Sequence, residues 1–462
     1  MKFPGGYKFK NFEGMAEPIL RELPVPETVF IPLNEKGLIN QTPTFTPSIE
    51  KGDTVRAGER LLQSDSEPLI SIASPVNGTV TGCDEDGITI SSDGTEGFEP
   101  VEGHTRAPWH LGREDAFNLS CSSGCILLFN DSFSSLSDLD RVKHIIINAV
   151  HNSPLNQSWS PGITGDPNIF YDGIRTLKVL FPESEIIIAV NKRNMKFFNT
   201  PEIKEHASAV ILSGRYPQEH PELLSRDTVH KRLVSPEGVY DSSILLIQFL
   251  DVIRIAETMT RGRPFIDRIL MIAGPGVSRP GWYRVRIGTP FEAIRHHLLK
   301  SDDYGPWRIV RGGILTGESV VSPDASVQPA DTEISVIREY AVRDLYRFIN
   351  PGFTYDSYSR TTAAEYIPLL PKQLDSNVHG GVRPCVQCNY CDEVCPVGIY
   401  PHLIRKYVVA DRADESFRFR PYDCIECGLC DYVCPSKIDI ASDVVKAKEE
   451  YHTRRREIEI SD

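Results

Sequence analysis

Eight of the eleven cysteines lie near the carboxyl end, in two runs of identical spacing. The runs are Cys385-x2-Cys388-x2-Cys391-x3-Cys395-Pro396 and Cys424-x2-Cys427-x2-Cys430-x3-Cys434-Pro435. Thiolates in the pattern C-x2-C-x2-C-x3-C-P are typical ligands of [4Fe–4S] clusters, so the repeat predicts two such clusters. The chemistry of a cluster of this kind is the transfer of single electrons.

The spacing also predicts how the cysteines divide between the two clusters. Three cysteines at x2 spacing wrap around one cubane, while the fourth, after x3, points to the other. The expected ligand sets are Cys385, Cys388, Cys391 and Cys434 for the first cluster, and Cys424, Cys427, Cys430 and Cys395 for the second. Structural zinc is the alternative for paired CxxC motifs. Zinc, however, requires neither the x2-x2-x3 spacing nor the two prolines.

Residues beside the cysteines fit a chain that wraps tightly around a cluster. Asn389 and Gly428 follow the second cysteine of each run, and both residue types tolerate a left-handed backbone. Each terminal proline lacks an N–H and turns the chain away. Helical spacing over 403–414, between the runs, predicts an α-helical dicluster ferredoxin module.

Length and composition bound the rest of the chain. The 462 residues suggest roughly three domains, and 40% hydrophobic and 24% charged residues are ordinary for a globular protein. The net charge of −13 argues against a nucleic-acid partner. The longest apolar candidate, 244–253, contains Gln248 and Asp251, so no transmembrane segment is expected. The amino terminus lacks the apolar region of a secretory signal.

The three remaining cysteines are scattered through the first third of the chain. A long, unsignalled chain with clustered thiols indicates metal ligands in a reducing compartment rather than a disulfide framework. Cys83, Cys121 and Cys125 are interpreted as small hydrophobic residues, although the last two, at x3 spacing, could alternatively form a redox or ligand pair.

Residues 1–105 read as a β-domain. Short β-prone runs at 29–33, 69–72 and 88–90 are separated by turn formers such as Asn77-Gly78 and Asp86-Gly87. The paired segments 49–55 and 74–80 resemble the barrel-sandwich fold of biotinyl and lipoyl carriers. Because no lysine lies between Gly52 and Gly97, a docking role is expected in place of a swinging arm.

Residues 106–265 predict an α/β domain. Apolar runs at 142–150 and 185–190 have the character of buried parallel strands, and 169–180 has helical spacing between them. In 266–355 strand and turn residues alternate, with a strand at 269–272, a strand exit at Gly274-Pro275-Gly276 and a helix over 291–299. The stretch 368–381 is predicted to be a linker, so that 356–462 holds a linker and the cysteine module. The charged tail 444–456 indicates a solvated helix face.

The order of these parts resembles the C subunit of the Rnf electron transport complex, together with its relative, the A subunit of the sodium-translocating NADH:quinone reductase. The Rnf likeness rests on Gly5-Gly6, Glu22-Leu23-Pro24-Val25-Pro26, Ile287-Gly288-Thr289-Pro290 and Asp423-Cys424-Ile425-Glu426-Cys427-Gly428. The likeness to the reductase rests on 249–253, 268–275, 312–317 and Ile334-Ser335-Val336. The resemblance implies a multidomain α+β fold in which 266–355 is a small β-grasp-like (SLBB) domain.

The resemblance also implies FMN and NADH, bound through a glycine-rich loop and an acidic segment. At the equivalent places this chain has 118–128, where Gly124 is the only glycine, and Val150-His151-Asn152-Ser153-Pro154. Without glycines, backbone amides cannot approach a phosphate closely. The expected cofactors are therefore two [4Fe–4S] clusters, with FMN and NADH as an alternative. No catalytic or nucleotide-binding residue is assigned.

These observations lead to one principal hypothesis and two alternatives. The principal hypothesis is a peripheral iron–sulfur electron-transfer subunit on the cytoplasmic side of the membrane, docked on the membrane and iron–sulfur subunits of an ion-translocating Rnf/Nqr-type complex. A ferredoxin-like protein is a possible donor. The alternatives are an NADH/FMN-dependent dehydrogenase subunit of the same complex, and a docking scaffold with a decayed nucleotide site.

Overall fold

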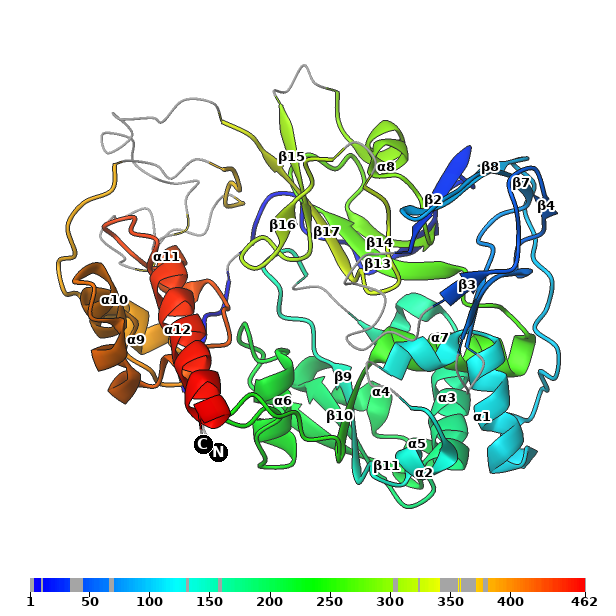
Figure 1. Cartoon of the computed structure of the whole chain (residues 1–462), viewed down its shortest axis with the longest axis horizontal. Coiled ribbons are helices and arrows are strands. Elements are labelled where there is room, and N and C mark those ends of the chain that lie inside the picture. The colour runs from blue at the N-terminus through cyan, green and yellow to red at the C-terminus, as the bar shows by residue number, and fades with distance from the viewer. Residues whose placement is uncertain are drawn as a thin grey trace.

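The computed structural model describes most of the chain. The described residues are 4–9, 11–33, 45–65, 70–129, 133–156, 160–301, 306–322, 325–340, 356, 358, 371–376 and 381–461. Four β-sheets make up the body of the described part. The C-terminal helices lie on the side of the molecule opposite the N-terminal sheets (Figure 1). The chain is thus a mixed α+β protein with several sheets.

Two small antiparallel sheets form the N-terminal region. The first has the order β2-β8-β7-β4 and the second β3-β5-β6. Their strands are β2 (Thr28–Pro32), β3 (Phe45–Pro47), β4 (Thr54–Val55), β5 (Arg60–Ser64), β6 (Ser71–Ala73), β7 (Gly78–Cys83) and β8 (Gly87–Ser92). Alternating residues such as Val29, Ile31, Ile88 and Ile90 point into a shared core. The predicted strands at 29–33 and 88–90 are confirmed; of 69–72, Leu69 lies outside the described residues.

A parallel sheet of order β11-β10-β9-β12 follows. Its strands are β9 (His144–Ala149), β10 (Glu185–Asn191), β11 (Ala207–Leu212) and β12 (Ile244–Gln248). Around it lie η1 (Pro108–His110), α1 (Arg113–Ser122), η2 (Cys125–Phe129), α2 (Leu136–Leu139), η3 (Pro161–Thr164), α3 (Pro167–Leu180), η4 (Lys192–Asn194), α4 (Met195–Phe198), α5 (Pro201–Lys204), α6 (Pro221–Thr228) and α7 (Phe249–Arg261). Both predicted strands and the helix between them are confirmed. The apolar stretch 244–253 is a buried strand that runs directly into a buried helix.

The third region is a mixed six-stranded sheet of order β1-β14-β13-β17-β15-β16. Its elements are β1 (Leu20–Glu22), β13 (Asp267–Ala273), β14 (Gly281–Arg286), β15 (Trp307–Arg311), β16 (Glu318–Ser319) and β17 (Glu333–Arg338), with helix α8 (Phe291–Leu298). Strand β1 pairs with β14, so the N-terminal segment crosses to this sheet. The predicted strand at 269–272 and helix at 291–299 are confirmed.

Buried charges join this sheet to the parallel one. Arg254 on α7 is 1% exposed and lies 3.3 Å from the carboxylate of Asp267 on β13. Arg284 on β14 approaches the same carboxylate at 3.0 Å and Glu257 at 2.9 Å. Because each buried charge has an opposite charge beside it, the network ties α7 to β13 and β14.

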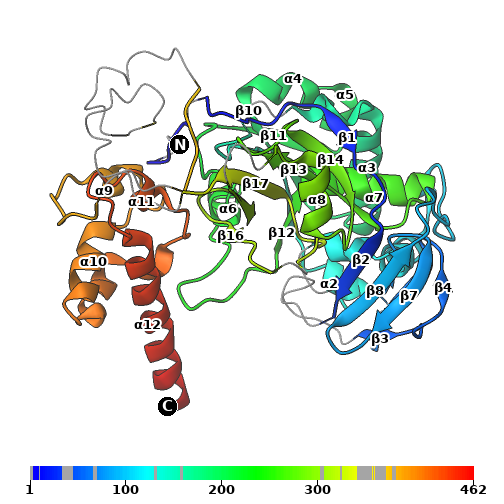
Figure 2. The same cartoon turned by 90° about the horizontal axis from the view of Figure 1, so that it is seen from above.

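The C-terminal region consists of helices and connecting loops. Its elements are α9 (Tyr390–Val394), α10 (Pro401–Val409), η8 (Ala413–Phe419), η9 (Pro421–Asp423), α11 (Leu429–Tyr432) and α12 (Ile440–Ser461). Helix α10 confirms the predicted helix between the cysteine runs and ends earlier, at Val409. Figure 2 shows α12 extending away from the sheets. Of the predicted linker, 368–370 and 377–380 lie outside the described residues. No helix in the described part of the chain is long and apolar enough to cross a bilayer.

Candidate metal centres

The first cysteine run forms a loop that leads into a short helix. Cys385 is exposed, Cys388 is half-buried, and Cys391, on α9, is buried with Cys395 at the end of that helix. Asn389 opens α9 with φ +60°, which confirms the left-handed backbone expected there. This reversal brings the cysteines before and after it to one side of the loop.

The second run repeats the arrangement. Gly428 has φ +73° and opens α11, and Cys424, Cys427 and Cys430 are half-buried while Cys434 is buried. A Cβ on Gly428 would lie 2.6 Å from the carbonyl oxygen of Leu315, which explains why this position holds glycine where the first run has asparagine.

Each predicted ligand set lines one cavity. Cys385, Cys388, Cys391 and Cys434 line the first, which we name the cluster I pocket. Cys395, Cys424, Cys427 and Cys430 line the second, the cluster II pocket, which Cys391 also touches. The fold therefore brings the fourth cysteine of each run to the other run's three, in the exchange that the spacing predicts.

The raised pKa values of the cysteine thiols are consistent with a bound cationic group in each cluster pocket. Burial raises the pKa of Cys391 to about 12, of Cys424 to about 11 and of Cys427 to about 12. Neighbouring cysteines raise these values further, because several thiolates packed together repel one another. Such thiols can be ionised together only when positive charge lies among them, as iron would provide.

Backbone N–H groups face the sulfurs from both runs. The amide of Glu426 donates to Sγ of Cys424 at 3.4 Å. Burial raises the pKa of Cys395, and the amides of Val397, Gly398 and Ile399, which donate to its sulfur, oppose that rise. Hydrogen bonds of this kind stabilise thiolate charge and tune cluster potentials.

Two aspartates that the sequence analysis did not single out hold the helices after each run. Asp431 follows Cys430, and its Oδ1 accepts from the amides of Ile440 and Ala441 at 2.7 and 2.8 Å, at the start of α12. Asp392 follows Cys391, and its Oδ1 lies 2.9 Å from Nδ1 of His402 on α10. The repeated sequence C-D-x-V-C-P is the signal that could have revealed both residues.

One further group of potential metal ligands occurs among the described residues. Ligand atoms of Cys391, Asp392 and His402 lie within 4.8 Å of one another. Because Asp392 and His402 already contact each other and Cys391 belongs to the cluster I pocket, we interpret this group as support for that pocket.

The cysteine module is held against the body by groups from distant parts of the chain. The hydroxyl of Tyr216 donates to the carbonyl of Cys427 at 2.9 Å, and the amide of Gly6 donates to Val394 at 2.8 Å. Tyr432 packs on the ring of Phe9 with centroids 5.2 Å apart. These contacts lie on the side of the cluster II pocket, which therefore faces the body.

A larger cavity lies at the carboxyl edge of the parallel sheet. This sheet-edge cavity has a volume of about 320 Å³ and is lined by Tyr7, Lys8, Phe9, His151, Asn152, Asn191, Lys192, Arg193, Leu212, Ser213, Gly214 and Tyr216. Ligands of α/β proteins commonly bind at such an edge. Its cations and amides suit an anionic group, and burial lowers the pKa of His151 to about 4, which keeps that ring neutral.

The segment where the sequence resemblance implies a loop for flavin or nucleotide phosphate is largely helical. Residues 118–128 form the end of α1, a turn and most of η2, and Cys121 and Cys125 are buried in the core there. Gly124 has φ +75°, but a Cβ on it would lie 2.8 Å from the carbonyl oxygen of Ser71. The backbone at Gly124 is therefore packed against Ser71, where a phosphate would otherwise have to approach. These residues do not fit a phosphate-binding loop.

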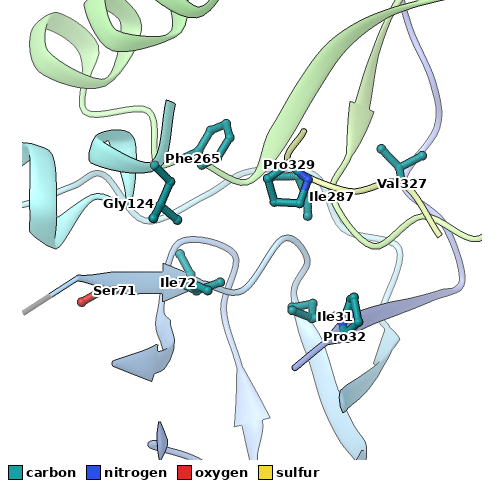
Figure 3. Close-up of a pocket in the computed structure, with 11 residues that line it drawn as sticks. Ile31, Pro32, Ser71, Ile72, Gly124, Phe265, Ile287, Val327 and Pro329 are labelled. Atoms are coloured by element: carbon teal, nitrogen blue, oxygen red, sulfur yellow. The ribbon is translucent and has the colours of Figure 1, made fainter. Parts of the chain in front are cut away.

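A fourth cavity lies where the N-terminal sheets meet the other regions (Figure 3). Its lining is almost entirely apolar, including Ile31, Ile72, Phe265 and Ile287, and its volume is about 20 Å³. That space holds roughly one water molecule, and the lining offers few polar partners, so we assign it no chemistry.

Comparison with known proteins identifies a 4Fe-4S dicluster domain at residues 384–438, which spans both cysteine runs. Over most of its length the chain is similar to the A subunit of the Na(+)-translocating NADH-quinone reductase. Identity is 25% with that of Actinobacillus pleuropneumoniae serotype 3 (strain JL03), covering 86% of this chain and 89% of the relative, and 24% with that of Histophilus somni (strain 129Pt), covering 80% and 81%.

The resemblance inferred from the sequence is therefore confirmed. Among solved structures, an NAD+-reducing [NiFe]-hydrogenase in the air-oxidized state matches with a TM-score of 0.40 and 10% identity, covering 77% of this chain and 65% of that chain. The iron–sulfur domain and the relatives together indicate an electron-transfer role in a redox complex.

Proposed function

We propose that this chain is a peripheral iron–sulfur electron-transfer subunit of a membrane-bound, ion-translocating oxidoreductase complex of the Rnf/Nqr type. Two [4Fe–4S] clusters supply reversible one-electron transfer when bound. The observation that supports this proposal most directly is the division of the eight cysteines between two pockets, with the fourth cysteine of each run exchanged.

The residues of the chain have distinct tasks in this role. Cys385, Cys388, Cys391 and Cys434 would hold the cluster of the cluster I pocket, and Cys424, Cys427, Cys430 and Cys395 that of the cluster II pocket. Backbone amides stabilise the thiolates, and the aspartate after each third cysteine fixes the helix behind it. Since the relatives are named as parts of a Na(+)-translocating NADH-quinone reductase, we place the chain on the cytoplasmic side of such a complex, docked on its other subunits.

The four segments 1–105, 106–265, 266–355 and 356–462 serve this proposal as separate units. We propose a barrel-sandwich-like domain, a degenerate flavin/NADH-type domain and an SLBB-like domain that together place the cluster module. Strand β1, which pairs with β14, links the first unit to the third.

Cofactor analysis of anaerobically purified protein tests the function. About eight iron and eight acid-labile sulfide atoms per chain, no flavin, and the EPR signals of two reduced clusters after dithionite are expected. Protein that contains zinc in place of iron, or that is colourless and magnetically silent, would contradict the proposal. Intact clusters with potentials far from any plausible partner would favour a scaffold.

The sheet-edge cavity favours a second candidate, a dehydrogenase subunit that binds FMN and NADH without the usual loop. Lys192 and Arg193 supply positive charge at the carboxyl edge of the sheet, and Tyr216 lines this cavity while contacting Cys427. Bleaching of the iron–sulfur absorbance by NADH would establish this candidate, while bleaching by dithionite alone supports the first.

A further inference from the structure

One edge of the cluster I pocket opens to solvent. All seven residues of the segment 381–387 are exposed, and Cys385 is the only exposed cysteine of the chain. Val382 is 61% exposed and Val386 is 66% exposed. Two exposed aliphatic side chains near a proposed cluster ligand make a small apolar centre. We call the whole segment, with these side chains, the 381–387 surface.

Although exposed, this surface is held in place by the second cysteine run. The amide of Arg383 donates to the carbonyl of Ser436 at 2.9 Å, and its guanidinium donates to the carbonyl of Pro435 at 2.7 Å. The hydroxyl of Ser436 in turn donates to the carbonyl of Pro384 at 2.9 Å. A surface fixed in this way loses little conformational freedom when a partner binds.

The charge of the surface is positive. Burial lowers the pKa of Lys437, and the nearby charge of Arg383 lowers it further, while the neighbouring sulfur of Cys434 acts in the opposite direction. No ion pair joins either side chain to a carboxylate of the described residues, and the sequence has no acidic residue between 381 and 391. In a chain whose net charge is −13, this pair of cations, which no carboxylate of the described residues neutralises, makes a local exception.

The cluster II pocket faces the opposite way. Gly428 abuts Leu315, the carbonyl of Cys427 accepts from Tyr216, and Arg226 donates to the carbonyl of Pro396 at 2.9 Å. The body of the protein thus covers that side of the module, while the 381–387 surface points away from these contacts.

We propose that the 381–387 surface is the docking site for an acidic electron-transfer protein, whose carboxylates surround an apolar centre over its own redox group. The inference rests on the proposed function and adds the partner's chemistry and the cluster that it approaches. A negative partner is repelled by most of this acidic chain and attracted at Arg383 and Lys437, so charge selects the orientation that brings it to Cys385.

Binding of a small acidic two-[4Fe–4S] ferredoxin to the holo-protein, measured by calorimetry, tests the inference. Arg383→Glu is expected to raise the dissociation constant about tenfold at low salt and Val386→Ser severalfold, while about 0.5 M salt removes the effect of the charge reversal. The matched controls are Lys406→Glu and Val409→Ser, at exposed positions of α10, and both are expected to bind like the wild type.

Cluster content separates the two proposals. Iron content and EPR signals are measured in every variant before binding, and a wild type without clusters would contradict the proposed function itself. If the clusters are intact, equal weakening of ferredoxin binding by Arg383→Glu and Lys406→Glu would overturn the docking proposal and leave the proposed function standing. The same holds if neither variant weakens binding. A dimer of this chain that is lost in Val386→Ser would overturn it too, because a second copy would then be the occupant.

Discussion

Asn389 and Gly428, two of the four left-handed residues of the cysteine runs, offer a matched comparison. Asn389 has φ +60° and is exposed, whereas Gly428 has φ +73° and is packed against Leu315. Gly428→Ala introduces a Cβ into the left-handed region, which costs about 1–2 kcal/mol. Asn389 already carries a Cβ, so Asn389→Ala loses only the greater tolerance of asparagine for this conformation and costs less. Only Gly428→Ala adds a clash.

The clash can be evaluated from the structure. The new Cβ would lie 2.6 Å from the carbonyl oxygen of Leu315 and 3.3 Å from its Cβ, well inside van der Waals contact with backbone that cannot rotate away. Overpacking of this kind typically costs about 1–3 kcal/mol. The sum for Gly428→Ala is therefore roughly 2–5 kcal/mol, directed at the segment between Cys427 and Cys430.

We expect Gly428→Ala to retain about four of about eight iron atoms per chain, because the cluster II pocket is disturbed, and Asn389→Ala to retain all of them. Iron and sulfide analysis with EPR of anaerobically reconstituted protein provides the measurement. Asn389→Gly, which relieves the backbone term, serves as the control and should match the wild type. Full iron content in Gly428→Ala, with a stability equal to that of Asn389→Ala, would refute the packing argument.

Three further outcomes are expected. Burial raises the pKa of Glu333 to about 7. The contribution of this carboxyl to the free energy of unfolding is therefore fully present below about pH 4.5 and falls by roughly 3 kcal/mol as pH rises through 7. Glu333→Gln should become more stable relative to the wild type between about pH 5 and pH 8 in denaturant unfolding, and a stability difference that does not change with pH would contradict this. Asp267→Asn should cost about 3–5 kcal/mol in thermal unfolding because it removes a buried carboxylate and leaves Arg254 and Arg284 to share Glu257 alone, against less than about 1 kcal/mol for Asp166→Asn, which breaks an exposed ion pair. Tyr216→Phe removes the donor to Cys427, worth about 1 kcal/mol, and should speed hydrogen exchange around that cysteine without changing iron content.

Features set by local sequence were predictable. The isoleucine runs at 145–147 and 186–188 are buried on both faces of a parallel sheet, where continuous apolar character is required. The left-handed backbone at Asn389 and Gly428 follows from residue type and from spacing to the cysteines. Such signals depend on neighbours within a few residues, which a sequence displays directly.

Features that depend on distant contacts were not predictable. Arg254 lies on an amphipathic helix, where a charged residue ordinarily faces solvent, and its burial depends on Asp267 from the next strand. The apolar run 244–253 predicts neither the strand nor the buried helix that it forms, although its polar residues Gln248 and Asp251 lie at the change from one to the other. The contacts of Tyr216 with Cys427 join residues 211 positions apart, which no local pattern encodes.

The cysteine module is attached to the body without using the residues of 118–128. Its contacts with the body include backbone groups, namely the amide of Gly6 and the carbonyl of Leu315, and neither depends on the residues of 118–128. That segment therefore forms a helix end with a buried core side independently of the position of Cys427 or Cys395. Because Tyr216 lines the sheet-edge cavity and also donates to Cys427, a ligand bound there would still lie one side chain from the cluster II pocket. If the second candidate function holds, a variant in the sheet-edge cavity should weaken nucleotide binding without changing iron content, because the cysteines lie outside that cavity.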